Sequence, residues 1–114
     1  MIRQENDMRT EYKEQMRGGT GTTELLHMEE AEGMKNARLL AKITLPPGAS
    51  IGEHAHENET EYYLILSGKG IVVDDGIDRE VGPGDVVITG GGASHSIRNS
   101  ANEPLVFHAV IVTY

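Results

Sequence analysis

The chain has 114 residues, of which 10 are Lys or Arg and 18 are Asp or Glu, so that its formal net charge is −8. An acidic chain without a basic cluster repels a phosphate backbone, so nucleic acid is not an expected partner. The absence of cysteine excludes a disulfide framework, a thiolate metal site and a cysteine nucleophile.

The N-terminal segment, residues 1–21, is expected to form an arm outside the main domain, which then comprises residues 22–114. The segment is polar, lacks apolar periodicity and ends in Gly-Gly-Thr-Gly at positions 18–21, which is typical of a hinge. Terminal segments stay disordered unless contacts hold them, so we expect the arm to be flexible or to lie across a partner subunit. The N-terminus lacks the apolar stretch of a signal peptide, and no apolar run is long enough to span a membrane. We therefore expect a cytoplasmic protein without a membrane partner.

Short apolar or alternating segments predict a series of β-strands. Residues 37–45 alternate apolar and polar side chains, which is the period of a half-buried strand. Residues 62–66 are apolar throughout, which predicts a strand covered on both faces, one of them by another sheet or subunit. This pattern and the short chain favour a homodimer. The other expected strands are residues 22–28, 71–73, 77–81, 86–89, 94–98 and 105–113.

Turn signals separate these strands. Asp-Asp-Gly at positions 74–76 predicts a hairpin, and Pro-Pro-Gly at positions 46–48 predicts a tight turn. Eight or nine short strands with glycine-rich turns and no convincing helix indicate an all-β sandwich or barrel.

The segment from Gly48 to Gly68 carries three side chains that are common metal ligands. Five residues separate Gly48 from His54, and four residues separate His56 from Glu61. Alternate side chains of a strand share a face, so His54 and His56 project in the same direction. Two imidazoles and one carboxylate can then bind one cation.

A second segment supplies a fourth ligand. It begins at Gly84, and two residues separate Gly92 from His95, while three residues separate His95 from Asn99. Three imidazoles and one carboxylate leave about two positions open on an octahedral ion, which suits Mn, Fe, Ni or Co better than a closed tetrahedral Zn site. The expected cofactor is one divalent transition metal per chain (Mn, Fe, Ni, Co or Zn), and its expected ligands are His54, His56, Glu61 and His95.

The two segments resemble the two sequence motifs of the cupin family, and the resemblance covers about residues 38–112. Every defining position of the first motif is met. In the second motif, Gly90 stands where the family usually has proline, a change that loosens a turn and removes no ligand. The resemblance implies a small single-domain jelly-roll β-barrel.

The carboxylate is the least secure of the implied ligands, because some family members lack it. Glu57 and Glu59 lie between His56 and Glu61 on the expected rim of the barrel. Glu59 would replace Glu61 as a ligand only in a distorted loop.

Two residues are candidates for a catalytic role. Tyr63 shares the strand parity of Glu61 and should point into the barrel, where it either hydrogen-bonds a ligand or fills the core. His108 shares parity with Val106 and Val110, and it lines either the cavity or the opposite face of the sheet.

The expected cavity is mostly apolar. Oxalate-degrading cupins carry an arginine three residues before the first ligand histidine, whereas this chain has Ile51 there, which argues against oxalate decarboxylation by that arrangement. Ile65 and Ile97 also face inward, and Arg38 and Lys42 are the cationic exceptions. An open metal in such a cavity fits a small organic substrate or a carboxylate.

The resemblance implies a metal-dependent enzyme that acts on a small carboxylic or carbonyl compound by dioxygenation or decarboxylation. Sugar isomerisation or epimerisation is one alternative. A second alternative is a non-catalytic module that binds a small molecule through the metal, and a third is a structural dimer in which the metal is adventitious.

Overall fold

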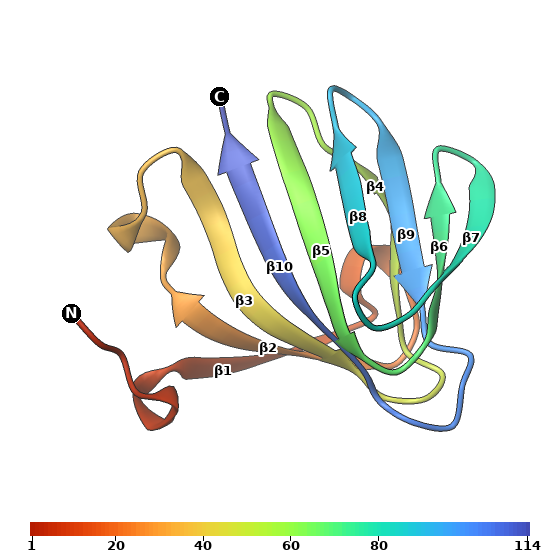
Figure 1. Ribbon diagram of the computed structural model, residues 1–114, viewed down its shortest axis with the longest axis horizontal. Helices are drawn as coiled ribbons and strands as arrows, with labels where there is room; N and C mark the ends of the chain where they lie inside the picture. Colours follow the sequence, from red (N-terminus) through yellow and green to blue (C-terminus); the bar gives the residue numbers. More distant parts are fainter.

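The computed structural model describes residues 1–114, and it contains ten β-strands, three short 3-10 helices and no α-helix (Figure 1). The strands are β1 (Arg9–Glu14), β2 (Thr22–Glu29), β3 (Ala37–Leu45), β4 (Ser50–Ala55), β5 (Glu59–Ser67), β6 (Gly70–Asp74), β7 (Ile77–Val81), β8 (Val86–Gly90), β9 (Ser94–Arg98) and β10 (Leu105–Thr113). The 3-10 helices are η1 (Glu5–Asp7), η2 (Met16–Gly18) and η3 (Ala31–Gly33).

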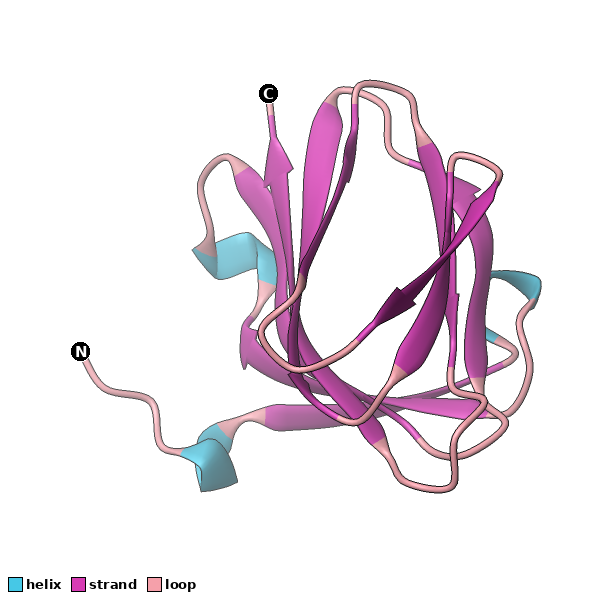
Figure 2. Ribbon diagram, turned by 45° about the vertical axis from the view of Figure 1, so that its right-hand side comes forward, coloured by secondary structure: helices cyan, strands magenta, loops and turns pink.

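The strands form two antiparallel sheets that face each other and enclose the core (Figure 2). One sheet has the order β1-β2-β3-β10-β5-β8, and the other has the order β4-β9-β6-β7. Because consecutive strands often lie in different sheets, the chain crosses repeatedly from one layer to the other. This arrangement is a small jelly-roll barrel, so the predicted fold class is confirmed.

Strict alternation of side chains fills the space between the sheets. On β10, Leu105, Phe107 and Ala109 are fully buried, whereas the alternate residues Val106 and Val110 are only partly buried. The second sheet contributes Ile51, Val72 and Ile97 to the same core. The inward positions of Ile51, Ile65 and Ile97 are therefore as expected.

Each predicted strand is observed, but the structure adds β1, inside the segment expected to be an arm, and β4, which was not among the predicted strands. A further difference concerns the segment around residues 62–66. β5 begins earlier, at Glu59, and its outward side chains Leu64 and Leu66 are 39% and 43% exposed in the single chain. The sequence predicts that both faces of this strand are covered, but no other part of the chain covers its outer face.

The N-terminal segment has definite contacts with the rest of the chain. β1 pairs with β2 and so extends the larger sheet at its edge. Thr20 Oγ1 donates a hydrogen bond of 2.8 Å to the carbonyl of Gly48, and the Ser50 N–H donates one of 2.8 Å to the carbonyl of Thr20. The description of residues 1–21 as a flexible or exchanged arm stays a prediction.

No helix of the structure is long and apolar enough to cross a membrane. The cytoplasmic location stays a prediction.

Asn99, which ends the second sequence motif, holds a loop rather than a ligand. Its buried side-chain amide donates hydrogen bonds of 2.9 Å to the Leu45 carbonyl and 2.7 Å to the Glu103 carbonyl. Its side-chain oxygen accepts a hydrogen bond of 3.0 Å from the Ala101 N–H. These bonds connect the loop between β9 and β10 to the end of β3.

We expect Asn99→Ala to lower the free energy of unfolding by about 2–4 kcal/mol, because it leaves buried backbone groups without partners. Asn102→Ala, in the same loop but exposed, should change it by less than about 0.5 kcal/mol. Urea unfolding of the two variants measures the difference. Equal stability of both variants would contradict the stabilising role that we assign to the Asn99 hydrogen bonds.

Candidate metal centre

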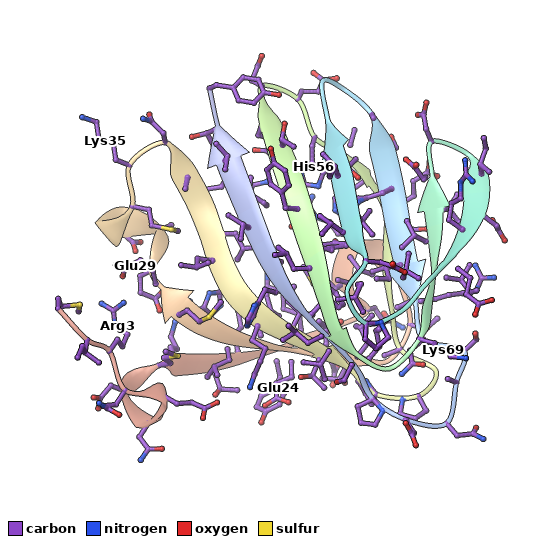
Figure 3. All side chains as sticks on the ribbon, in the orientation of Figure 1. Arg3, Glu24, Glu29, Lys35, His56 and Lys69 are labelled. Atoms are coloured by element: carbon purple, nitrogen blue, oxygen red, sulfur yellow. The ribbon has the colours of Figure 1, made fainter.

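His54, His56, Glu61 and His95, which we call the histidine–glutamate cluster, come together inside the barrel between the two sheets. Their ligand atoms all lie within 4.8 Å of one another. His54 and His95 are direct partners in the β4–β9 register, whereas Glu61 extends from β5 in the opposite sheet. In Figure 3, His56 lies between the sheets, while Lys35 extends outward from the barrel. The structure therefore brings together the four side chains that the motif spacing selects.

The glycine-rich loop before β9 positions His56, which follows the last residue of β4. The His56 N–H donates a hydrogen bond of 3.1 Å to the Ala93 carbonyl, and the Gly92 N–H donates one of 2.8 Å to the His56 carbonyl. Gly92 has a positive φ of 89°, which favours glycine. The glycines of the second motif thus support a ligand of the first motif.

The Nε2 atoms of the three histidines point at one another and at the Glu61 carboxylate. His95 Nε2 lies 3.0 Å from His54 Nε2 and 3.1 Å from His56 Nε2. Glu61 Oε1 lies 2.9 Å, 3.0 Å and 3.6 Å from the Nε2 atoms of His56, His95 and His54, respectively. Four nitrogen and oxygen atoms therefore surround one small volume.

The opposite ring nitrogen of each histidine has its own hydrogen-bond partner. His54 Nδ1 donates to the Gly52 carbonyl at 2.7 Å, and His56 Nδ1 donates to Glu59 Oε2 at 2.5 Å. Both partners can only accept, so Nδ1 carries the proton and Nε2 of the neutral ring keeps a lone pair. His95 Nδ1 lies 2.8 Å from the hydroxyl of Thr89, which the β5–β8 register places opposite Glu61. This pattern is typical of imidazoles that bind metal through Nε2.

The electrostatics of the cluster favour a cation. Burial raises the pKa of the Glu61 carboxyl, but its close contacts with the three imidazole rings outweigh burial and lower this pKa below its ordinary value. Hydrogen bonding to Glu61 raises the pKa of His56, while burial lowers the pKa of His95. One buried negative charge and three nitrogen donors form a ligand set that fits a divalent transition metal.

Sequence reasoning missed the role of Glu59. Its buried carboxylate accepts a hydrogen bond from His56 and two of 2.7 Å from the Arg38 guanidinium. The Arg38 hydrogen bonds, with a smaller contribution from His56, lower the pKa of Glu59 to about 2. Glu59 is thus a positioning residue for His56, and Arg38 keeps it ionised. Two features of the sequence could have indicated this role. Glu59 and Glu61 are two residues apart and so share a face of the strand, and Arg38 was expected to point into the cavity.

Tyr63 lies in the core directly beside the cluster. Its ring stacks on the His95 imidazole with centroids 4.9 Å apart, and it also packs against Phe107. Burial raises the pKa of its phenol well above the ordinary value, and the negative charge of Glu61 adds to this effect. The phenol therefore stays protonated and can donate a hydrogen bond near the cluster.

His108, the other candidate catalytic residue, does not join the cluster. Its neighbours Phe107 and Ala109 point into the barrel, so His108 lies on the outer face of the larger sheet. Lys42 also lies outside the cavity, where its ammonium is 3.4 Å from Glu5 Oε1.

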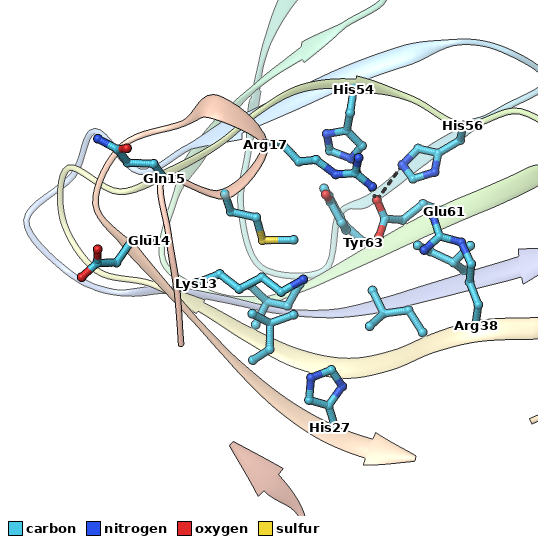
Figure 4. A pocket seen from close by; sticks show the side chains of 15 residues that line it. Lys13, Glu14, Gln15, Arg17, His27, Arg38, His54, His56, Glu61 and Tyr63 are labelled. Atoms are coloured by element: carbon cyan, nitrogen blue, oxygen red, sulfur yellow. Dashed lines mark ion pairs between the residues drawn. The ribbon is translucent and has the colours of Figure 1, made fainter. Parts of the chain in front are cut away.

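A cavity of about 420 Å³ opens onto the cluster (Figure 4). His27 lines this cavity and forms a 2.8 Å hydrogen bond with Glu11, a pairing that the sequence does not predict. The cavity also has three cationic side chains in its wall: Lys13, Arg17 and Arg38. A small molecule can thus reach the cluster past positive charge.

Comparison with known proteins places this geometry in a family. The family that is described as Cupin domain matches residues 41–112. A protein of Thermotoga maritima named an oxalate-binding protein is 45% identical over 113 residues, which cover 98% of this chain and 93% of that relative. An uncharacterised protein of Methanocaldococcus jannaschii is 34% identical over 87 residues, which cover 76% of this chain and 68% of that relative.

A solved structure shows the same fold over the full length. It is the crystal structure of a predicted oxalate decarboxylase from Thermotoga maritima, which is 43% identical to this chain with a TM-score of 0.94. The match covers 100% of both chains.

The low pKa of Glu59 makes the stability of the metal-free protein depend on pH in the acidic range. Because this pKa falls from 4.5 to about 2 on folding, the ionised group stabilises the fold fully above pH 4.5, and the contribution is lost as the pH falls through about 2. The difference corresponds to at most about 3 kcal/mol. We expect Glu59→Gln to remove this part of the pH dependence in urea unfolding with a chelator present.

Glu57→Gln is the matched control, because Glu57 is exposed and two residues away. It should keep the wild-type pH dependence. A Glu59→Gln variant with the wild-type slope between pH 4.5 and 2 would contradict the assignment of the Arg38–Glu59 pair.

Proposed function

The chain belongs to the cupin family, and from this membership we propose that its histidine–glutamate cluster binds one divalent transition metal and, through it, a small carboxylate such as oxalate. The observation that carries the proposal is the set of three Nε2 atoms and one carboxylate oxygen directed at one volume beside a cation-lined cavity.

The donor set supports the metal part of the proposal. His54 and His56 have their Nδ1 protons engaged by groups that only accept, so their Nε2 lone pairs are available to a cation. A bound divalent metal supplies Lewis acidity and open coordination positions for carboxylate oxygens. Glu59 and Thr89 then hold the His56 and His95 rings in orientation, as outer partners of metal-ligating histidines do.

The charge of the cavity supports the carboxylate part. Lys13 and Arg17 line the cavity with no carboxylate as an ion-pair partner, so they favour an anionic ligand. A relative at 45% identity is named an oxalate-binding protein, which points to the same class of compound.

The side chains beside the cluster are suited to binding rather than to removing a proton. Glu61 is engaged by the three imidazoles, and Glu59 is engaged by Arg38 and His56. Tyr63 stays protonated, so it can orient a ligand oxygen by donating a hydrogen bond. The remaining carboxylate of the cavity wall is Glu14, which points away from the cluster in Figure 4, so no free base lies next to the cluster, which disfavours sugar isomerisation.

A metal-dependent enzyme is the second candidate, with dioxygenation or decarboxylation as its reaction. The observation that favours it is the cavity, which gives a small substrate access to the cluster. The solved relative described as a predicted oxalate decarboxylase points the same way.

The exposed apolar side chains on the larger sheet support a further proposal, a homodimer. They lie on the outward side of neighbouring strands β10, β5 and β8, and a monomer rarely exposes such a continuous apolar face. A twofold dimer buries the same patch of both subunits. The side chains are Leu64, Leu66, Val86, Ile88 and Val112, which are 37–62% exposed.

Calorimetric titration with oxalate tests the main proposal. Manganese-loaded wild type should bind oxalate, and chelator-treated wild type should bind it at least about tenfold more weakly, because the open metal positions are lost. The control is His108→Ala, which removes an imidazole that lies outside the cluster. This variant should bind oxalate as wild type does. Equal affinity of the loaded and metal-free proteins would contradict the proposal.

The same samples separate binding from turnover. Release of CO₂ from oxalate, or dioxygen consumption in an electrode with oxalate present, would establish the enzyme. Stoichiometric oxalate binding without either signal is the result we expect of a binding protein.

Sedimentation equilibrium tests the dimer. Wild type should sediment at twice the chain mass of 12.4 kDa, and Leu64→Asp with Ile88→Asp should give the monomer, because burying a carboxylate in the interface is costly. Ile77→Asp, at an exposed apolar residue of the other sheet, should remain dimeric. A monomeric wild type would refute this interface.

A further inference from the structure

Arg17 is the arginine of the cavity that has no partner. Four of the six arginines form ion pairs with carboxylates, namely Arg3, Arg9, Arg38 and Arg98. Arg79 and Arg17 form none, and of these two only Arg17 lines the cavity at the cluster. Arg38 also lines it, but Glu59 already occupies the guanidinium of Arg38. The cavity therefore contains one guanidinium free to bind an anion.

The Arg17 side chain points toward the cluster. Figure 4 shows it extending from the η2 turn toward His54, Tyr63 and Glu61. Burial raises the pKa of the Tyr63 phenol, and the positive charge of Arg17 acts against that rise, which places the charge within electrostatic reach of the phenol. An anion on the cluster would therefore lie near both the Arg17 guanidinium and the Tyr63 hydroxyl.

The backbone holds Arg17 in an unusual conformation. Its φ of 54° and ψ of 30° are left-handed, which a residue with a Cβ rarely adopts. The turn is closed by hydrogen bonds of 2.9 Å from the Gly18 N–H to the Gln15 carbonyl and from the Gly19 N–H to the Met16 carbonyl. Such conformations persist where surrounding contacts enforce them, and they cluster at ligand sites.

The turn is fixed to β4, the strand that carries His54. A Cβ at Gly52 would lie 2.1 Å from the Arg17 carbonyl oxygen, so only glycine allows this approach. The same Gly52 supplies the carbonyl that accepts from His54 Nδ1. One residue of β4 thus sets both the orientation of a cluster imidazole and the position of the turn that carries Arg17.

We propose that Arg17 is the specificity-determining residue of this site and selects dicarboxylates, with one carboxylate of the ligand at the cluster and the second paired with the Arg17 guanidinium. The planar guanidinium can form two parallel hydrogen bonds to a carboxylate, which lysine cannot. This inference rests on the proposed function, because it needs the metal-dependent site for the first carboxylate.

The test is calorimetric titration of manganese-loaded protein with oxalate. Arg17→Gln should weaken oxalate binding at least about tenfold, and Arg17→Lys should lie between this variant and wild type, because it keeps the charge without the paired donors. Arg79→Gln is the matched control, since it removes an exposed, unpaired arginine that does not line the cavity at the cluster. It should stay within about twofold of wild type.

Acetate and metal content complete the test. Acetate has one carboxylate, so its affinity should change by less than about threefold in Arg17→Gln. Metal content should stay at one ion per chain in all variants. The inference is overturned if Arg17→Gln binds oxalate within twofold of wild type, or if it loses the metal. A metal-loaded wild type that binds neither oxalate nor acetate would instead overturn the proposed function, and this inference with it.

Discussion

The buried carboxylate of Glu61 is the charge around which the site is organised. An ionised carboxylate inside a barrel is costly unless a positive charge or hydrogen-bond donors lie beside it. Here the Nε2 atoms of His56 and His95 lie 2.9 Å and 3.0 Å away, so a cation bound between them and Glu61 would offset that cost. Those rings are held in turn by Glu59 and Thr89 through Nδ1. The result is a set of donors whose positions are fixed before any ligand arrives, which is the condition for tight binding of a metal.

The sequence predicts this centre well because its elements follow local rules. Strand alternation brings Glu61 and Tyr63 to the inner face, and the glycine spacing of the two motifs places His95 opposite His54. The closing strand is also recognisable, since β-branched and aromatic residues dominate it. These features depend on residues near one another in sequence, or on periods that a strand imposes.

What the sequence does not show depends on contacts between distant segments. Arg38 and Glu59 are 21 residues apart, and no local pattern indicates that they meet and orient His56. The pairing of β1 with β2 was not expected, because the β1 segment is mostly polar and lies at an edge of the sheet. Arg17 reaches the cavity only because Gly52 lets the η2 turn approach β4. The outward position of His108 could not be predicted, because residues 105–113 are apolar at almost every position and so do not indicate which side of the strand faces the core.

Metal analysis by plasma mass spectrometry tests the central claim most directly, on protein purified without an affinity tag or chelator. The account predicts close to one transition-metal ion per chain in wild type, and its loss in a His54→Ala, His56→Ala variant that remains folded. A metal-free wild type, or equal metal content in the variant, would contradict the claim that the cluster is a metal centre.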